Sequence, residues 1–82
     1  MATQTKTIVL YTKKENCPDC EVAKRFLADH DIGYESRDVV ENRDYMLELV
    51  QNYRSMSVPT LVVDGQAIIG FKKDEYEEIL GL

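Results

Sequence analysis

With 82 residues, of which 44% are hydrophobic, the chain is long enough for a single small domain, expected over residues 1–82, and too short for two. Its fifteen acidic residues outnumber ten scattered basic ones, for a formal net charge of −5, which argues against a nucleic-acid binder. The polar stretch 1–6 has no apolar run typical of a secretory signal, and no segment reaches membrane-spanning length. We therefore expect a cytosolic protein without a membrane partner.

The first half of the chain predicts a buried strand, a polar loop and an amphipathic helix. Residues 7–11 are apolar or β-branched without alternation, which is typical of a strand buried on both faces. Residues 12–16 form the loop. In the helix that follows, ending near His30, we expect an i,i+4 ion pair between Glu21 and Arg25 on the outer face. The residues expected to face the core are Val22, Ala23, Phe26 and Leu27.

The second half predicts a strand, a helix, a hairpin and a last helix. Residues 34–40 form the strand, and Asn42 suits the cap of the helix that follows it. Residues 60–63 and 66–69 flank Asp64-Gly65, a strong signal for an antiparallel hairpin. The last helix covers 73–80. The residues expected to face the core are Met46, Leu47, Val50 and Tyr53 in the second helix, and Tyr76, Ile79 and Leu80 in the last.

The predicted order is β-α-β-α-β-β-α, an α/β fold in which three helices flank a four-stranded mixed sheet. Active groups in such sheets gather beyond the carboxyl ends of the parallel strands. The stretch 15–21 comes just after the first strand, and it holds the chain's only two cysteines, Cys17 and Cys20. We therefore expect the functional site there.

The Cys17-Pro18-Asp19-Cys20 motif spans the predicted start of the first helix. Pro18 suits the first helical position, because its missing N–H is not needed there. Thiols three residues apart on a helix lie on one face and can form a disulfide. This pattern favours a dithiol that cycles through a disulfide. Two alternatives remain: incidental small apolar residues, or part of a metal site, for which a single histidine leaves the ligand set incomplete without a second chain.

The two sulfurs should differ in reactivity. Cys17 faces the unpaired N–H groups and the positive end of the helix dipole, which favour the attacking thiolate. Lys13 and Lys14 add positive charge nearby. Cys20, inside the first turn, should resolve the mixed disulfide. Asp19 opposes the thiolate, so we expect the Cys17 pKa to be lowered less than with a neutral residue there.

Taken together, the motifs resemble a glutaredoxin-like protein of the thioredoxin fold over residues 8–80. The resemblance implies dithiol–disulfide exchange, in which Cys17 attacks a disulfide, Cys20 releases it and a reducing system resets the pair. It also implies a cis Val58–Pro59 bond, whereas the residues alone favour trans. The motifs that carry it are Tyr11-Thr12-Lys13, Cys17-Pro18-Asp19-Cys20, Ser57-Val58-Pro59-Thr60, Asp64-Gly65 and Ile69-Gly70-Phe71.

The resemblance implies a set of binding residues as well. The backbone of Val58 would pair with the substrate peptide, and a lysine before the cysteines would hold glutathione or the target with the backbone around Gly70. Lys13 and Lys14 both qualify, because the loop is one residue longer than usual. The expected substrate-binding residues are Lys13, Lys14, Pro18, Asp19, Val58, Pro59, Thr60, Gly70, Phe71 and Lys72.

Departures from the usual glutaredoxin bear on the electron source. Asp19 replaces an aromatic residue, and the Gly-Gly, small residue, Asp pattern of glutathione-binding members is replaced by Gly70-Phe71-Lys72-Lys73-Asp74. The latter resembles redoxins that donate electrons to ribonucleotide reductase and are reduced by thioredoxin reductase, although Ile68 and Ile69 stand where tryptophan and serine are expected. We expect a monomer with no tightly bound cofactor. Its electrons would come from glutathione or from NADPH through thioredoxin reductase, and its targets would be disulfide-containing proteins, ribonucleotide reductase among them.

Two other classes compete with this interpretation. An iron–sulfur cluster or metal carrier would bridge two chains through Cys17, and it predicts a coloured or zinc-loaded dimer with little reductase activity. An inactive binding module on the same fold would leave two well-placed thiols unexplained. The retained Cys20 and the stiff Pro18 favour the redox enzyme.

Overall fold

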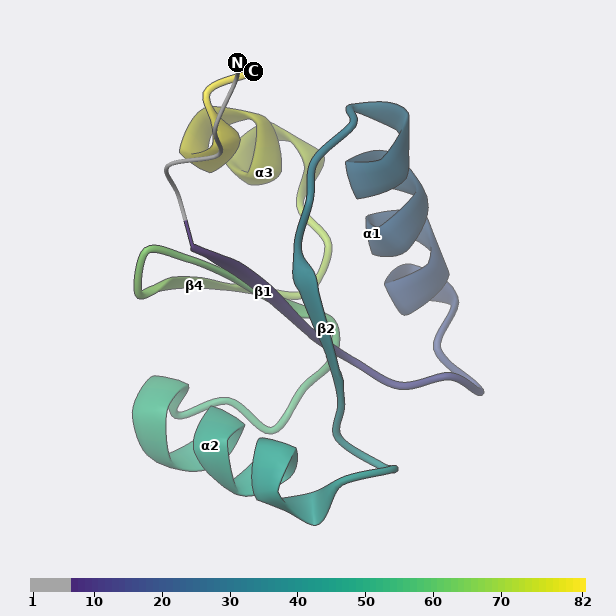
Figure 1. The fold of residues 1–82 in the computed structure, drawn as a ribbon, viewed down its shortest axis with the longest axis vertical. Coiled ribbons are helices and arrows are strands. Elements are labelled where there is room, and N and C mark those ends of the chain that lie inside the picture. The colour runs from purple at the N-terminus through teal and green to yellow at the C-terminus, as the bar shows by residue number, and fades with distance from the viewer. Residues whose placement is uncertain (1–6) are drawn as a thin grey trace.

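The computed structural model describes residues 7–82, which form a four-stranded sheet and three helices (Figure 1). The sheet order is β2-β1-β3-β4; β1 and β2 are parallel, and the other two pairs are antiparallel. This confirms the predicted order and the thioredoxin-like fold. In this part of the chain, no helix has the length and apolar character needed to cross a membrane. The elements are β1 (Ile8–Thr12), α1 (Pro18–Asp29), β2 (Glu35–Asp38), α2 (Arg43–Tyr53), β3 (Thr60–Val63), β4 (Gln66–Ile69) and α3 (Lys73–Leu80).

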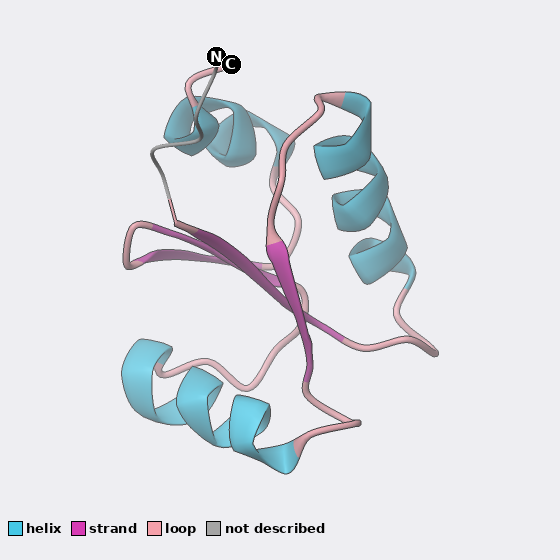
Figure 2. Cartoon of the chain, viewed as in Figure 1, coloured by secondary structure: helices cyan, strands magenta, loops and turns pink. Residues whose placement is uncertain are grey.

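Helices α1 and α3 cover one face of the sheet, and α2 covers the other (Figures 1 and 2). Along β1, Ile8 and Leu10 belong to the core beneath α1 and α3, whereas Val9 and Tyr11 belong to the core beneath α2. Every residue of β1 is therefore buried. Burial on both faces explains why the sequence of this strand shows no alternation.

An aromatic cluster connects α1 to α3 across the first of these faces. The Phe26 ring lies 5.7 Å from Phe71 and 5.8 Å from Tyr76, and the Phe71 and Tyr76 rings are 4.9 Å apart, all close to edge-to-face. Phe71 lies between β4 and α3. The cluster therefore fixes the segment after β4 against the helix that begins at the cysteine pair.

The inward face of α2 differs from the predicted one. Leu49 is completely buried, whereas Leu47 and Val50 are 54% and 36% exposed. Met46 and Tyr53, which were expected to face the core, do pack against it. Residues 46, 49 and 53 follow an i, i+3, i+7 stripe along one side of the helix. Because successive residues are rotated by about 100° around the helix axis, neighbouring positions in the sequence lie off this stripe. The sheet contacts this stripe and leaves Leu47 and Val50 on the flank.

Smaller differences concern α1 and the ends of the strands. Val22 is 46% exposed instead of buried, and Glu21 pairs with Lys24 at 3.4 Å instead of with Arg25. Thr12, predicted in the loop, is the last residue of β1, and β2 is three residues shorter than predicted. It ends at Asp38, whose Oδ1 accepts the N–H groups of residues 40 and 41 at 2.8 and 2.9 Å. Such a turn competes with the strand ladder and ends it.

Candidate active site

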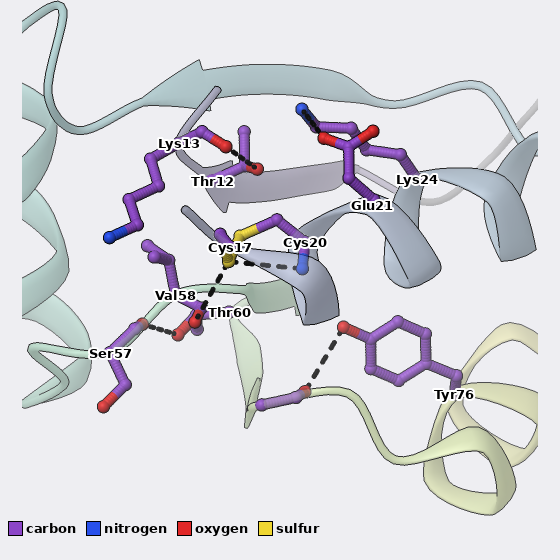
Figure 3. Close-up of a disulfide and its surroundings, with 11 residues drawn as sticks. Thr12, Lys13, Cys17, Cys20, Glu21, Lys24, Ser57, Val58, Thr60 and Tyr76 are labelled. Carbon is purple, nitrogen blue, oxygen red and sulfur yellow. Dashed lines mark hydrogen bonds and ion pairs between the residues drawn. A yellow bond between two sulfur atoms is a disulfide. The ribbon is translucent and has the colours of Figure 1, made fainter. Parts of the chain in front are cut away.

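Cys17 and Cys20 are joined by a disulfide at the start of α1, and their Cα atoms lie 5.2 Å apart (Figure 3). Cys17 is the N-cap and Pro18 the first helical residue, as the spacing predicts. Cys20 is completely buried, whereas Cys17 is half-buried. An incoming molecule therefore reaches the sulfur of Cys17 before that of Cys20.

The Cys17 sulfur accepts a backbone N–H at the positive end of α1. The Cys20 N–H donates to Cys17 Sγ over 3.2 Å, and the Cys17 carbonyl accepts from the N–H groups of Cys20 and Glu21 at 3.1 and 3.3 Å. After reduction, the same N–H and the helix dipole favour a thiolate at this position. This geometry supports the assignment of Cys17 as the attacking sulfur.

The Val58–Pro59 segment flanks the Cys17 sulfur, and its peptide bond is cis, as the resemblance implies. The Val58 carbonyl oxygen lies 3.8 Å from Cys17 Sγ. In the disulfide this sulfur has no proton, so the approach is a contact and not a hydrogen bond. A reduced thiol could donate to the carbonyl, whereas a thiolate would be repelled by it.

The Gly70 segment is held next to this loop by two hydrogen bonds. The Gly70 N–H donates to the Pro59 carbonyl at 2.8 Å, and the Tyr76 hydroxyl donates to the Gly70 carbonyl at 3.3 Å (Figure 3). Burial raises the pKa of Tyr76, so its hydroxyl remains a proton donor at neutral pH. Gly70 has a φ of +81°, in the left-handed region that favours glycine.

The two lysines of the preceding loop differ in their partners. Lys14 pairs with Glu41, which raises the Lys14 pKa through their hydrogen bond. Lys13 makes no ion pair within residues 7–82, although both lysines line the same cavity of about 320 Å³. Figure 3 shows the Lys13 side chain directed away from α1. Lys13 is therefore the better placed of the two to contact an anionic partner.

The remaining expected binding residues vary in exposure. Pro18, Asp19 and Lys72 are exposed, and Lys72 lies 3.7 Å from Glu75. Thr60 is completely buried, so its side chain cannot touch a partner directly. Its hydroxyl instead contacts the loop before Pro59, together with Ser55, a residue that sequence reasoning missed. The available signal was the concentration of hydroxyl residues around Val58-Pro59.

Replacing Asp19 with asparagine should lower the pKa of reduced Cys17 by less than about one unit. The exposed carboxylate, two residues along the chain from Cys17, opposes the thiolate, and solvent screening limits its effect. The ultraviolet absorbance of the thiolate, followed through a pH titration, measures the pKa. Asp29→Asn, at the far end of α1, serves as the control and should change it little. A higher Cys17 pKa in the Asp19→Asn variant would contradict the expectation that the carboxylate opposes the thiolate.

Among residues 7–82, no three or more His, Cys, Asp or Glu side chains gather in a position to hold a metal ion. A carrier bridged through Cys17 would draw ligands from a second chain, and such a dimer would be recognised by its colour or bound zinc.

Comparisons with known proteins cover most of the chain. The family model described as Glutaredoxin matches residues 8–68, which include both cysteines and Pro59. The glutaredoxin-like protein NrdH of Lactococcus lactis subsp. lactis (strain IL1403) is 23% identical over 73 residues, 88% of this chain and 99% of that protein. An uncharacterized glutaredoxin-like 8.6 kDa protein in the rubredoxin operon of Clostridium pasteurianum is 27% identical over 64 residues, 78% and 85% of the two chains.

Solved structures extend the comparison to the fold. The thioredoxin-like protein BC3987 superimposes with a TM-score of 0.85 at 33% identity, covering 89% of this chain and 99% of that one. A glutaredoxin from Archaeoglobus fulgidus superimposes with a TM-score of 0.80 at 18% identity, covering 93% and 87%. At that identity, the second comparison shows the shared fold alone.

Proposed function

Because this chain belongs to the glutaredoxin family, we propose that it is a thiol–disulfide oxidoreductase that reduces protein disulfides, or mixed disulfides with glutathione, through Cys17 and Cys20. The main observation behind the proposal is that the two paired sulfurs have different surroundings. Cys17 is accessible and accepts an N–H at the helix start, whereas Cys20 is buried behind it. This is the arrangement that nucleophilic attack and subsequent release require.

The reduced pair transfers two electrons to the target. The Cys17 thiolate attacks one sulfur of the target disulfide, forms a mixed disulfide and releases the other target sulfur, which takes up a proton. Cys20 then loses its proton and attacks Cys17 Sγ, which releases the second target thiol and forms the internal disulfide present in the structure. A reductant returns two electrons and two protons to the pair.

We assign target binding to residues that surround the Cys17 sulfur. The Val58 backbone lies against it, and Gly70 is connected to the same loop through the Pro59 carbonyl. Lys13 supplies a positive charge that no ion pair neutralises among the described residues. We also include Pro18, Asp19 and Lys72, which are exposed, among the proposed binding residues.

For the electron source, we favour NADPH through thioredoxin reductase over glutathione. The Gly70–Asp74 pattern resembles the redoxins that serve ribonucleotide reductase, and two relatives are named glutaredoxin-like protein NrdH. Ribonucleotide reductase is accordingly a proposed target, and the reducing cytoplasm is the proposed compartment.

A paired assay tests both the function and the electron source. Reduction of a protein disulfide is followed with NADPH and thioredoxin reductase in one reaction, and with glutathione and its reductase in the other. We expect faster turnover with thioredoxin reductase. Faster turnover with glutathione would contradict the proposed electron source but would still support the oxidoreductase function. The absence of turnover in both reactions would contradict the function itself. Matched reactions without the protein give the background rate.

A further inference from the structure

Two buried hydroxyl groups lie beneath the loop that precedes Pro59. Ser55 and Thr60 are only 2% and 0% exposed, and their hydroxyl oxygens are 3.2 Å apart. A buried hydroxyl is unfavourable unless it is hydrogen-bonded, and valine would fill nearly the same space as Thr60 without that requirement. The position of these hydroxyls therefore calls for an explanation other than packing.

Both hydroxyls bind the backbone of Ser57. Thr60 Oγ1 donates to the Ser57 carbonyl over 2.7 Å, and the Ser57 N–H donates to Ser55 Oγ over 3.2 Å. The Ser55 hydroxyl also lies 3.3 Å from the Ser57 carbonyl. Both polar backbone groups of Ser57 are thereby turned toward the protein interior.

This arrangement determines where the next N–H points. The Ser57–Val58 peptide bond is trans, and in a trans peptide the carbonyl and the N–H point in opposite directions. Because the Ser57 carbonyl points inward, the Val58 N–H points away from the two hydroxyls. The structure gives this N–H no hydrogen-bond partner within residues 7–82. Val58 is half-buried, and its carbonyl lies 3.8 Å from Cys17 Sγ, so this N–H belongs to the residue whose backbone contacts the reactive sulfur (Figure 3).

We propose that Ser55 and Thr60 are positioning residues that aim the Val58 N–H at the main chain of an incoming protein disulfide. The inference rests on the proposed oxidoreductase function. A target carbonyl that accepts from Val58 would hold the target as an added strand, with its disulfide against Cys17. A small disulfide without a peptide backbone offers no such carbonyl, so its reduction should not depend on the two hydroxyls.

Steady-state kinetics of the Thr60→Val variant test this inference, with insulin as the protein disulfide and hydroxyethyl disulfide as the small one. Loss of one hydrogen bond that orients the donor should increase the KM for insulin by about three- to tenfold. The turnover number at saturating insulin and the rate with hydroxyethyl disulfide should remain unchanged. Thr60→Ser retains a hydroxyl and should restore the KM.

The matched control is Thr12→Val, another buried threonine, whose hydroxyl contacts the Lys13 carbonyl and not the loop before Pro59. It should leave the KM for insulin unchanged. Ser55→Ala removes the acceptor of the Ser57 N–H. If Thr60→Val does not fold, the KM of Ser55→Ala for insulin provides the test instead. An unchanged KM for insulin in the folded variant, or an equal loss with both disulfides, would overturn the positioning role. A wild-type protein that reduces neither disulfide would instead overturn the oxidoreductase function, and the inference with it.

Discussion

Replacing Cys17 with serine should reduce the rate of protein disulfide reduction to the background, a loss of at least about 10³-fold. The serine hydroxyl is not ionised at neutral pH, so the helix start that favours a thiolate at Cys17 cannot make serine a comparable nucleophile. The loss should be the same with either reducing system, because both act on the same pair. Stopped-flow or coupled NADPH oxidation measures the rate.

The Cys20→Ser variant separates the two sulfurs. It should lose protein disulfide reduction as well, because Cys20 releases the mixed disulfide, but it should retain reactions in which glutathione itself resolves a mixed disulfide on Cys17. Thermal melting of both variants, compared with the reduced wild type, controls for folding. If Cys17→Ser retained activity that Cys20→Ser lost, the two roles would have to be exchanged.

Replacing Leu49 with alanine should lower the free energy of unfolding by about 2–5 kcal/mol. Leu49 is completely buried between α2 and the sheet, in the core that contains Val9 and Val62. Truncation leaves a cavity that the strands on one side and the helix on the other cannot close fully. For a small domain with a total stability of about 5–15 kcal/mol, this is a large fraction.

Leu47→Ala is the matched control, two residues away on the same helix. Leu47 is 54% exposed, and its truncation should lower the free energy of unfolding by less than about 1 kcal/mol. Urea unfolding, followed by circular dichroism, measures both variants. A larger loss of unfolding free energy in Leu47→Ala than in Leu49→Ala would mean that the predicted face of α2, which includes Leu47, packs against the sheet.

Much of the fold follows from local patterns. The continuous apolar run 7–11 predicts a central strand, and Asp64-Gly65 predicts the hairpin, in which φ values of 50° and 87° match the turn. Pro18 marks the first residue of α1. These signals are reliable because each depends on the conformational preferences of a few adjacent residues.

The orientation of α2 could not be obtained in the same way. Apolar residues at 46, 47, 49, 50 and 53 extend over a wide arc of the helix, so periodicity allows more than one inward face. The contact with the sheet selects among them. The same limit applies to Lys13 and Lys14, since Glu41, the residue that distinguishes them, lies in another loop.

The candidate site shows a similar division. The spacing of Cys17 and Cys20 predicts their pairing and their unlike environments, but the residues alone favour a trans Val58–Pro59 bond; the cis bond was implied by the resemblance. Thr60 was expected to bind substrate, but the contacts of its buried hydroxyl with Ser55 and the loop before Pro59 were not predicted. Hydroxyl residues are concentrated around Val58-Pro59, but the sequence does not show which buried atoms face each other.

The most direct test of the account is to trap the intermediate in which a target is bound to Cys17. The reduced Cys20→Ser variant is mixed with a protein disulfide, quenched with acid and analysed by mass spectrometry of its peptides. We predict a mixed disulfide on Cys17, because the resolving sulfur is absent. No adduct on Cys17, together with an adduct on Cys20 in the Cys17→Ser variant, would contradict the assignment of Cys17 as the attacking sulfur.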